Sequence, residues 1–146
     1  YSEVRYGFIN YIAKFSLAND IYHLTRKSKK HLQDINLLNT GTLLRGSKSQ
    51  KNRFTYEHPI PANIIAEQIL RSSLSNSEIL NILQWSNHIV VLTTEENKCF
   101  PKNLISSMPD GWEFFNSNIF QRYIDSKIID SLSELTDVPV HGAVKR

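Results

Sequence analysis

The segment 55–61 combines an acid and a histidine with two prolines, so its side chains are the first candidates for chemistry. The proline at 59 biases His58 toward extended backbone, because the proline ring crowds a helical conformation in the preceding residue. Pro61 can close a strand or open a helix, since it has no amide proton. We therefore predict that His58 ends an extended segment just before a chain reversal, and that its imidazole acts as a general base.

The segment before this histidine is strongly basic. Between residues 26 and 53 the chain has eight cations and the single acid Asp34, so this segment carries a net charge of +7 against +3 for the whole chain. Clustered cations indicate a polyanionic partner, with nucleic acid first, although a solvated face, an anionic membrane surface or an acidic protein partner would also fit. The residues that we expect to contact nucleic acid are Lys29, Lys30, Arg45, Lys48, Lys51 and Arg53.

The spacing of apolar residues predicts the elements that position these side chains. We expect helices at 3–16, from 19 or 20 to 38, at 63–71, after Ser75 to 85, and along 119–135, with a short helix capped by Thr94. Strands are expected at 43–46, 53–58 and 88–93, and the end from 136 to 146 reads as irregular. The sequence therefore predicts an α+β fold, mostly helical, with a small β-sheet near 43–58 and 88–93.

Length and composition narrow the class of protein. A chain of 146 residues with 40% apolar residues suits one folded domain, residues 1–146, and the missing initiator Met suggests the C-terminal part of a longer protein. No apolar run approaches the ~20 residues of a membrane-spanning helix. The single Cys99 can form neither an internal disulfide nor a thiolate metal site alone. No glycine-rich nucleotide loop is present, so we expect no organic cofactor.

Three pieces of the chain together resemble the HNH nucleases of the His-Me finger group. They are Glu57-His58-Pro59-Ile60-Pro61, then Asn87 at the start of an apolar strand, then Asn97 in the short helix that follows that strand. The resemblance covers residues 57–98, and the glycine-rich loop that usually precedes the middle Asn is missing.

The resemblance implies a role for each residue. His58 would deprotonate water for attack on a phosphodiester, and Asn87 would orient its imidazole. Asn97 and Glu57, or less favourably Glu96, would hold a divalent cation such as Mg²⁺ through oxygen. Arg53, together with Arg45 and Lys51, would hold neighbouring phosphates.

Two alternatives stay open at this stage. If His88 faces the same cleft as His58, the pair could cleave RNA without a metal, with Arg53 steadying the phosphorane. In size and charge the chain is similar to the C-terminal ribonuclease toxins of contact-dependent growth inhibition proteins, some of which act on tRNA. In the third interpretation the chain is a non-catalytic basic module that binds RNA or DNA.

A nuclease free in a bacterial cytoplasm would damage its own host. We therefore expect a toxin or defence enzyme that acts in the cytoplasm after delivery from another cell, as part of a secreted or surface protein. An acidic inhibitor (immunity) protein would cover its basic cleft. Expression of the isolated domain without a partner should stop bacterial growth, and harmless expression would contradict this expectation.

Overall fold

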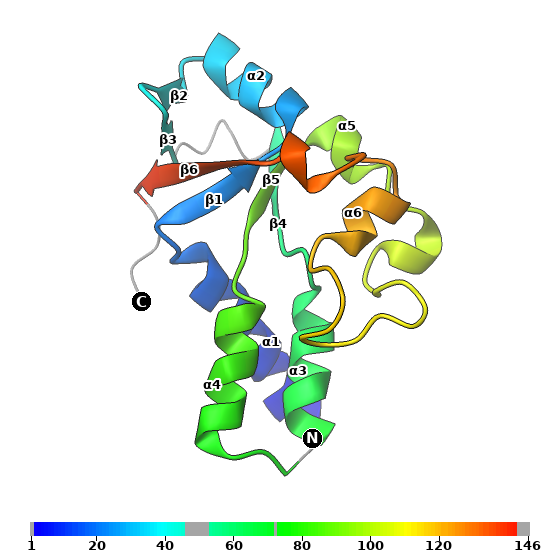
Figure 1. Cartoon of the computed structure of the whole chain (residues 1–146). Coiled ribbons are helices and arrows are strands. Elements are labelled where there is room, and N and C mark those ends of the chain that lie inside the picture. Colours follow the sequence, from blue (N-terminus) through cyan, green and yellow to red (C-terminus); the bar gives the residue numbers. More distant parts are fainter. Residues whose placement is uncertain (1, 46–52, 72, 143–146) are drawn as a thin grey trace.

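A mixed six-stranded sheet forms the centre of the molecule in the computed structural model, which describes residues 2–45, 53–71 and 73–142 (Figure 1). The strands are β1 (Ile21–Leu24), β2 (Leu38–Asn39), β3 (Thr42–Leu44), β4 (Phe54–Glu57), β5 (Val90–Thr93) and β6 (Thr136–His141). Their order across the sheet is β2-β3-β6-β1-β5-β4. The pairs β1–β5 and β3–β6 are parallel, and the other pairs are antiparallel.

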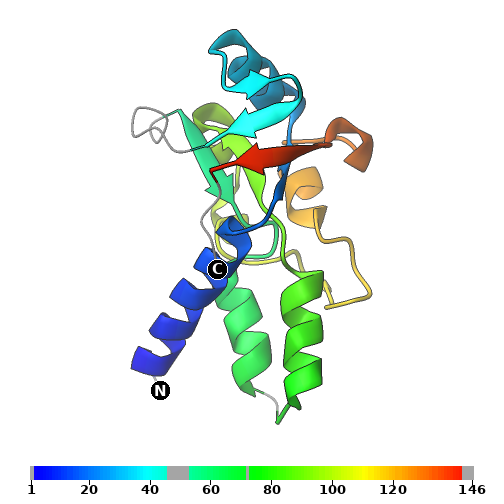
Figure 2. The same cartoon turned by 90° about the vertical axis from the view of Figure 1, so that its left-hand side faces the viewer.

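The helices lie at the two ends and on both faces of this sheet. They are α1 (Ser2–Leu17), α2 (Arg26–Asp34), α3 (Ala62–Arg71), α4 (Asn76–Trp85), α5 (Thr94–Asn97) and α6 (Gln121–Asp125), with 3-10 turns at Lys102–Leu104 and Leu132–Glu134. Figures 1 and 2 show α1, α3 and α4 extending together from one end of the sheet, with α2 at the other end. Among the described residues, no helix combines the length and apolarity that crossing a membrane requires.

Strand β5 separates two apolar clusters, because its side chains alternate between the two faces of the sheet and all four residues are buried. Val91 packs with Tyr22, Leu24 and the α2 residue Leu32 on one face. On the other face, Val90 and Leu92 pack with Phe100, Tyr123 and Ile129 from the C-terminal part of the chain. A third cluster joins α1, α3 and α4 through Ile12, Ile65 and Ile82. Side chains on opposite faces of β5 are therefore separated by the sheet and cannot form one site.

The predicted α+β class and the predominance of helix are confirmed. Strands occur at 42–44, 54–57 and 90–93 and helices at 2–17, 62–71 and 76–85, close to the predicted ranges. Ser75 caps α4 in the expected capping box, accepting a hydrogen bond from the amide of Glu78. For these elements, the capping residues, turn residues and periodic apolar residues of the sequence predict the structure correctly.

The predicted helix from 19 or 20 to 38 is wrong at both ends. At its C-terminal end, α2 stops at Asp34 and residues 38–39 form β2. Residues 21–24 form β1, and helix α2 begins only after Thr25. Tyr22 and Leu24 are buried while Ile21 is exposed, which is the alternation of a strand. Thr25 and Ser28 form a capping box that starts α2 at Arg26. Two apolar residues two positions apart therefore belonged to a strand and not to a helix turn.

The prediction that residues 136–146 are irregular is wrong for 136–141, which form β6 between β3 and β1. A proline is unusual in a strand that is interior to a sheet, because it cannot donate a ladder hydrogen bond. The structure places Pro139 opposite Ile21 at the end of the β1 pairing, and the β3 pairing begins at the next residue, Val140. The missing amide thus falls where β6 changes partner.

The helical spacing along 119–135 also predicted too much helix. Only residues 121–125 form an α-helix, α6, and Ser126 is its C-cap. The next residue, Lys127, has a left-handed backbone with φ of 57°, which ends the helix. The predicted short helix after β5 is present, but Thr94 is its first residue and not its cap. The cap is Thr93, whose hydroxyl accepts from the amide of Glu96.

Candidate active site

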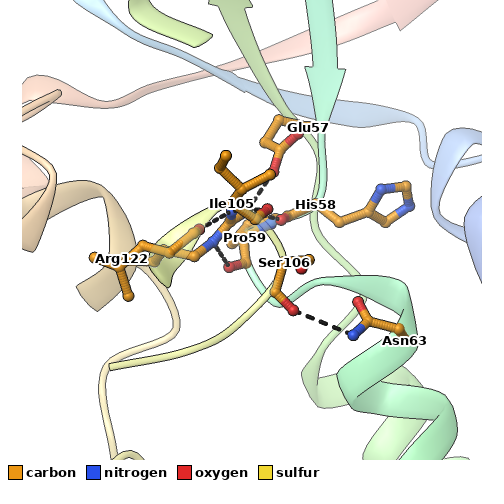
Figure 3. A network of polar contacts seen from close by, with 8 residues as sticks. Glu57, His58, Pro59, Asn63, Ile105, Ser106 and Arg122 are labelled. Carbon is orange, nitrogen blue, oxygen red and sulfur yellow. Dashed lines mark hydrogen bonds and ion pairs between the residues drawn. The ribbon is translucent and has the colours of Figure 1, made fainter. Parts of the chain in front are cut away.

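Strand β4 delivers Glu57 and His58 to opposite sides of the sheet, because successive side chains on an extended strand alternate. Glu57 pairs in register with Val90 and so lies on the Val90 face, where its carboxylate forms an ion pair with Arg122. Figure 3 shows the His58 ring pointing away from both Glu57 and Arg122. The predicted acid–histidine pair is therefore adjacent in sequence but does not form one site.

Arg122 is the centre of the polar network in Figure 3, and its side chain is fully buried. Besides its ion pair with Glu57, its guanidinium donates hydrogen bonds to four backbone carbonyls. The acceptors are the oxygens of His58 at 2.7 Å, Pro59 at 3.2 Å, Leu104 at 2.9 Å and Ile105 at 3.1 Å. The group also lies over the ring of Phe100, 4.4 Å from its centroid. Sequence reasoning missed this residue, which looked like one polar residue in an apolar segment.

His58 packs against α1. Burial lowers its pKa, a hydrogen bond with the backbone of Ala13 opposes that shift, and the nearby positive charge of Arg122 adds to it, so the pKa is lowered overall. Its Nε2 is buried and has no hydrogen-bond partner among the described residues. His58 is therefore neutral at pH 7, as a general base requires, but its ring is enclosed between α1 and the sheet.

The residues predicted to hold a metal do not fit a shared site. Glu57 lies opposite Val90, where β5 begins, whereas Asn97 ends the helix that follows Thr93, where β5 ends. The length of β5 therefore separates them, about 10 Å at the ~3.3 Å rise of a strand residue. Glu96 is buried, and its carboxylate accepts from the amide of Thr93 and the hydroxyl of Thr25. Within the described ranges, no three His, Cys, Asp or Glu side chains gather as metal ligands.

The basic residues predicted to contact nucleic acid are distributed over several elements. Lys29 and Lys30 lie on α2, and Lys30 lines a small hollow with His31 beside Thr93. Arg53 is exposed just before β4, and Arg45 lies over the ring of Tyr56, 5.2 Å from its centroid. Lys48 and Lys51 lie outside the described residues.

The strongest cluster of chemical groups is a chain of three side chains, two from the neighbouring strands β1 and β6 and one from the segment just before β5. His23 Nδ1 lies 2.5 Å from Asp137 Oδ1, and His23 Nε2 lies 2.9 Å from His88 Nδ1. His23 on β1 pairs in register with Asp137 on β6 and with Val90 on β5, two residues after His88. The sheet topology thus brings together residues from positions 23, 88 and 137.

The direction of hydrogen bonding in this relay follows from the carboxylate, which can only accept. With both imidazoles neutral, His23 donates from Nδ1 to Asp137 and accepts at Nε2 from His88 Nδ1–H. His88 Nε2 then carries the lone pair. Burial and the neighbouring His23 lower the pKa of His88, while the backbone of Trp85 and the charge of Asp137 oppose that shift. The arrangement can accept a proton at His88 and stabilise the resulting charge through Asp137.

A hollow of about 370 Å³ gives access to the relay, and we call it the histidine hollow. Phe120 packs edge-on against both imidazoles, with centroid distances of 5.2 and 5.7 Å. Asn87 also lines this hollow, and its amide donates to Asn19 Oδ1 at 2.7 Å. Its Oδ1, the atom that would have oriented the His58 ring, is buried and has no hydrogen-bond partner among the described residues. The full lining is Asn19, Asp20, Ile21, His23, Asn87, His88 and Asp137.

The sequence carried part of the signal for this cluster. His88 was considered as one of two histidines in a metal-free site, but His58 was its expected partner. His23 was missed because residues 21–24 were assigned to a helix, and Asp137 because its segment was assigned to no element. Recognising the alternation in β1 and β6 would have placed both on the Val90 face.

Comparisons of the chain with known protein families, with curated proteins and with solved structures gave no match.

Replacing Arg122 should strongly destabilise the fold. Arg122→Met leaves Glu57 without its cation and four carbonyls without their donor, so we expect a loss of about 3–5 kcal/mol in the free energy of unfolding. Urea denaturation measures this, with Arg71→Met as the control, because Arg71 is 75% exposed. The control should lose under about 0.5 kcal/mol. A loss below about 1 kcal/mol for Arg122→Met would contradict the role given to this network.

Stability should fall in mild acid. The pKa values of His58 and His88 lie below 6.5 in the folded protein, so the unfolded chain binds more protons below that pH. The stability that these two neutral histidines contribute is fully present above pH 6.5. It is lost as the pH falls from 6.5 toward their pKa values in the folded protein. Urea denaturation measures the free energy of unfolding at about pH 7.5 and about pH 5.5. The decrease between these two pH values should be smaller for His58→Gln than for the wild type. The exposed-histidine variant His141→Gln is the matched control, and an equal difference in both variants would refute the prediction.

Proposed function

We propose that this chain is a metal-independent ribonuclease in which His88 is the general base. The observation that carries the proposal is the Asp137–His23–His88 relay at the histidine hollow. Its three members form a complete acid–base device from the chain's own side chains. The Asp137 carboxylate fixes the tautomer of the His23 imidazole. His23 in turn accepts from Nδ1–H of His88, which leaves His88 Nε2 free to accept a proton from the substrate.

The reaction needs only proton transfer and positioning. His88 Nε2 would take the proton from the 2′-hydroxyl of RNA while the 2′-oxygen attacks the adjacent phosphorus. The bond from phosphorus to the 5′-oxygen then breaks, which leaves a 2′,3′-cyclic phosphate. The relay returns a proton to the departing 5′-oxygen, so no proton is gained or lost overall. The lowered pKa of His88 supports this assignment, because a base must be neutral before it accepts.

RNA is the substrate that agrees best with the other features of the chain. The segment 26–53 has a net charge of +7, which favours a polyanion. A relay that moves protons between side chains suits a substrate that carries its own nucleophile, and of the two nucleic acids only RNA has the 2′-hydroxyl. The residues expected for a metal-dependent HNH mechanism, Glu57, His58 and Asn97, lie apart from one another.

The test is cleavage of total tRNA and of plasmid DNA by purified protein, each with Mg²⁺ and with EDTA. We expect tRNA to be cut in EDTA and DNA to remain intact. His88→Gln should lower the rate by at least about 100-fold, which is the usual contribution of a general base. Asp137→Asn should lower the rate and change its pH profile, because the middle imidazole loses its fixed tautomer. His141→Gln, an exposed histidine on β6, should retain full activity.

Two other results would overturn the proposal. Cleavage that requires Mg²⁺ and is abolished by His58→Ala, but not by His88→Gln, would establish the HNH-like mechanism. Binding of RNA without any cleavage under either condition would leave a basic binding module.

A further inference from the structure

A second hollow, of about 550 Å³, lies between α3 and the irregular segment 107–115, and we call it the aromatic hollow. Trp112, Phe114 and Phe115 line it, with the polar side chains Gln68 and Glu113. Trp85, at the end of α4, packs behind these rings. Its ring centroid lies 5.9 Å from that of Trp112, 6.0 Å from Phe114 and 5.1 Å from Phe115. Four aromatic rings thus gather at one hollow of the surface.

Phe115 has an unfavourable backbone conformation at the rim of this hollow. Its φ is 67°, in the left-handed region that a bulky side chain rarely adopts, and its side chain is 50% exposed. The loop is closed around it: the amide of Glu113 donates to Ser117 Oγ, and the amide of Ser117 donates to the carbonyl of Glu113. Strain that the surroundings impose on an exposed aromatic residue is typical of a binding site.

Two short segments of the chain connect the aromatic hollow to the histidine relay. Trp85 precedes His88 by three residues, so their Cα atoms lie at most about 10 Å apart. The backbone of Trp85 lies close enough to the His88 ring to raise its pKa. The segment that presents Phe115 continues to Phe120, which packs on His23 and His88. The rings around the aromatic hollow and the groups of the relay are therefore linked by two short segments of the chain, 85–88 and 115–120.

We propose that the aromatic hollow binds a nucleobase of the RNA on which His88 acts. This inference rests on the proposed function for the choice of RNA. Flat heteroaromatic rings stack on aromatic side chains, and every base has such a face. The Gln68 amide and the Glu113 carboxylate supply the donor and acceptors that the edge of a base requires. The hollow exceeds the size of one base, so it leaves room for the attached ribose.

Binding can be measured without any cleavage, because the only two tryptophans of the chain, Trp85 and Trp112, belong to this cluster. The four nucleoside 5′-monophosphates are titrated while tryptophan fluorescence is recorded, beside ribose 5-phosphate, which lacks the base. We expect saturable quenching by at least one nucleotide and none by ribose 5-phosphate.

Variants of Phe115 connect the signal to the hollow. Phe115→Gly removes the ring and suits the left-handed backbone, so the fold should be retained while nucleotide binding weakens roughly tenfold. Phe115→Tyr should retain binding. Tyr11→Ala is the matched control, because Tyr11 is an aromatic residue of α1 with similar exposure, 53%, and it should leave quenching unchanged. Thermal unfolding of each variant checks that its fold is intact.

Several outcomes would overturn the base site: equal quenching by ribose 5-phosphate, unchanged quenching in Phe115→Gly, or saturation by an aromatic dipeptide but by no nucleotide. The test also separates this inference from the proposed function. Nucleotide binding that depends on Phe115, without RNA cleavage, would support the base site and reject the ribonuclease. Cleavage that is intact in Phe115→Gly, without nucleotide quenching, would reject the base site alone.

Discussion

The buried guanidinium of Arg122 is the constraint on which the rest of the structure depends. An isolated charge in a protein interior is costly unless it is paired and hydrogen-bonded. Here Glu57 supplies the opposite charge, and the carbonyls of His58, Pro59, Leu104 and Ile105 accept the remaining N–H groups. One side chain therefore ties the end of β4, the turn after α5 and the start of α6 to one another. It also fixes Glu57 inward, which turns His58 toward α1.

The parts of the fold that the sequence predicted are those whose signals are local. Ser75 and Glu78 lie three residues apart and start α4, and the apolar, β-branched run at 90–93 predicts the strand β5. The signals that failed depend on distant partners. β6 is a strand because β1 and β3 flank it, and its proline is tolerated because the two pairings meet there. That arrangement cannot be read from residues 136–141 alone.

The candidate site shows the same division between local and distant information. Glu57 and His58 are neighbours in the sequence, which suggested a single catalytic site. Their side chains point to opposite faces of the sheet, because successive residues of a strand alternate. His23 and Asp137 are 114 residues apart and meet across adjacent strands. His88 was recognisable as a candidate from its place before an apolar strand, but its partner could be identified only once β1, β5 and β6 were placed in register.

Arg122 also explains how an irregular segment can hold its side chains in fixed positions. Residues 106–120 form neither an α-helix nor a strand. The Arg122 guanidinium binds the carbonyls of Leu104 and Ile105, just before this segment, and Arg122 itself follows closely after it. Both ends of the loop are therefore fixed to one buried group. Within it, Phe115 is displayed at the aromatic hollow and Phe120 covers the histidine relay. The buried Arg122 network thus does for this loop what hydrogen bonding within a helix or strand does elsewhere: it fixes where the side chains of the loop lie.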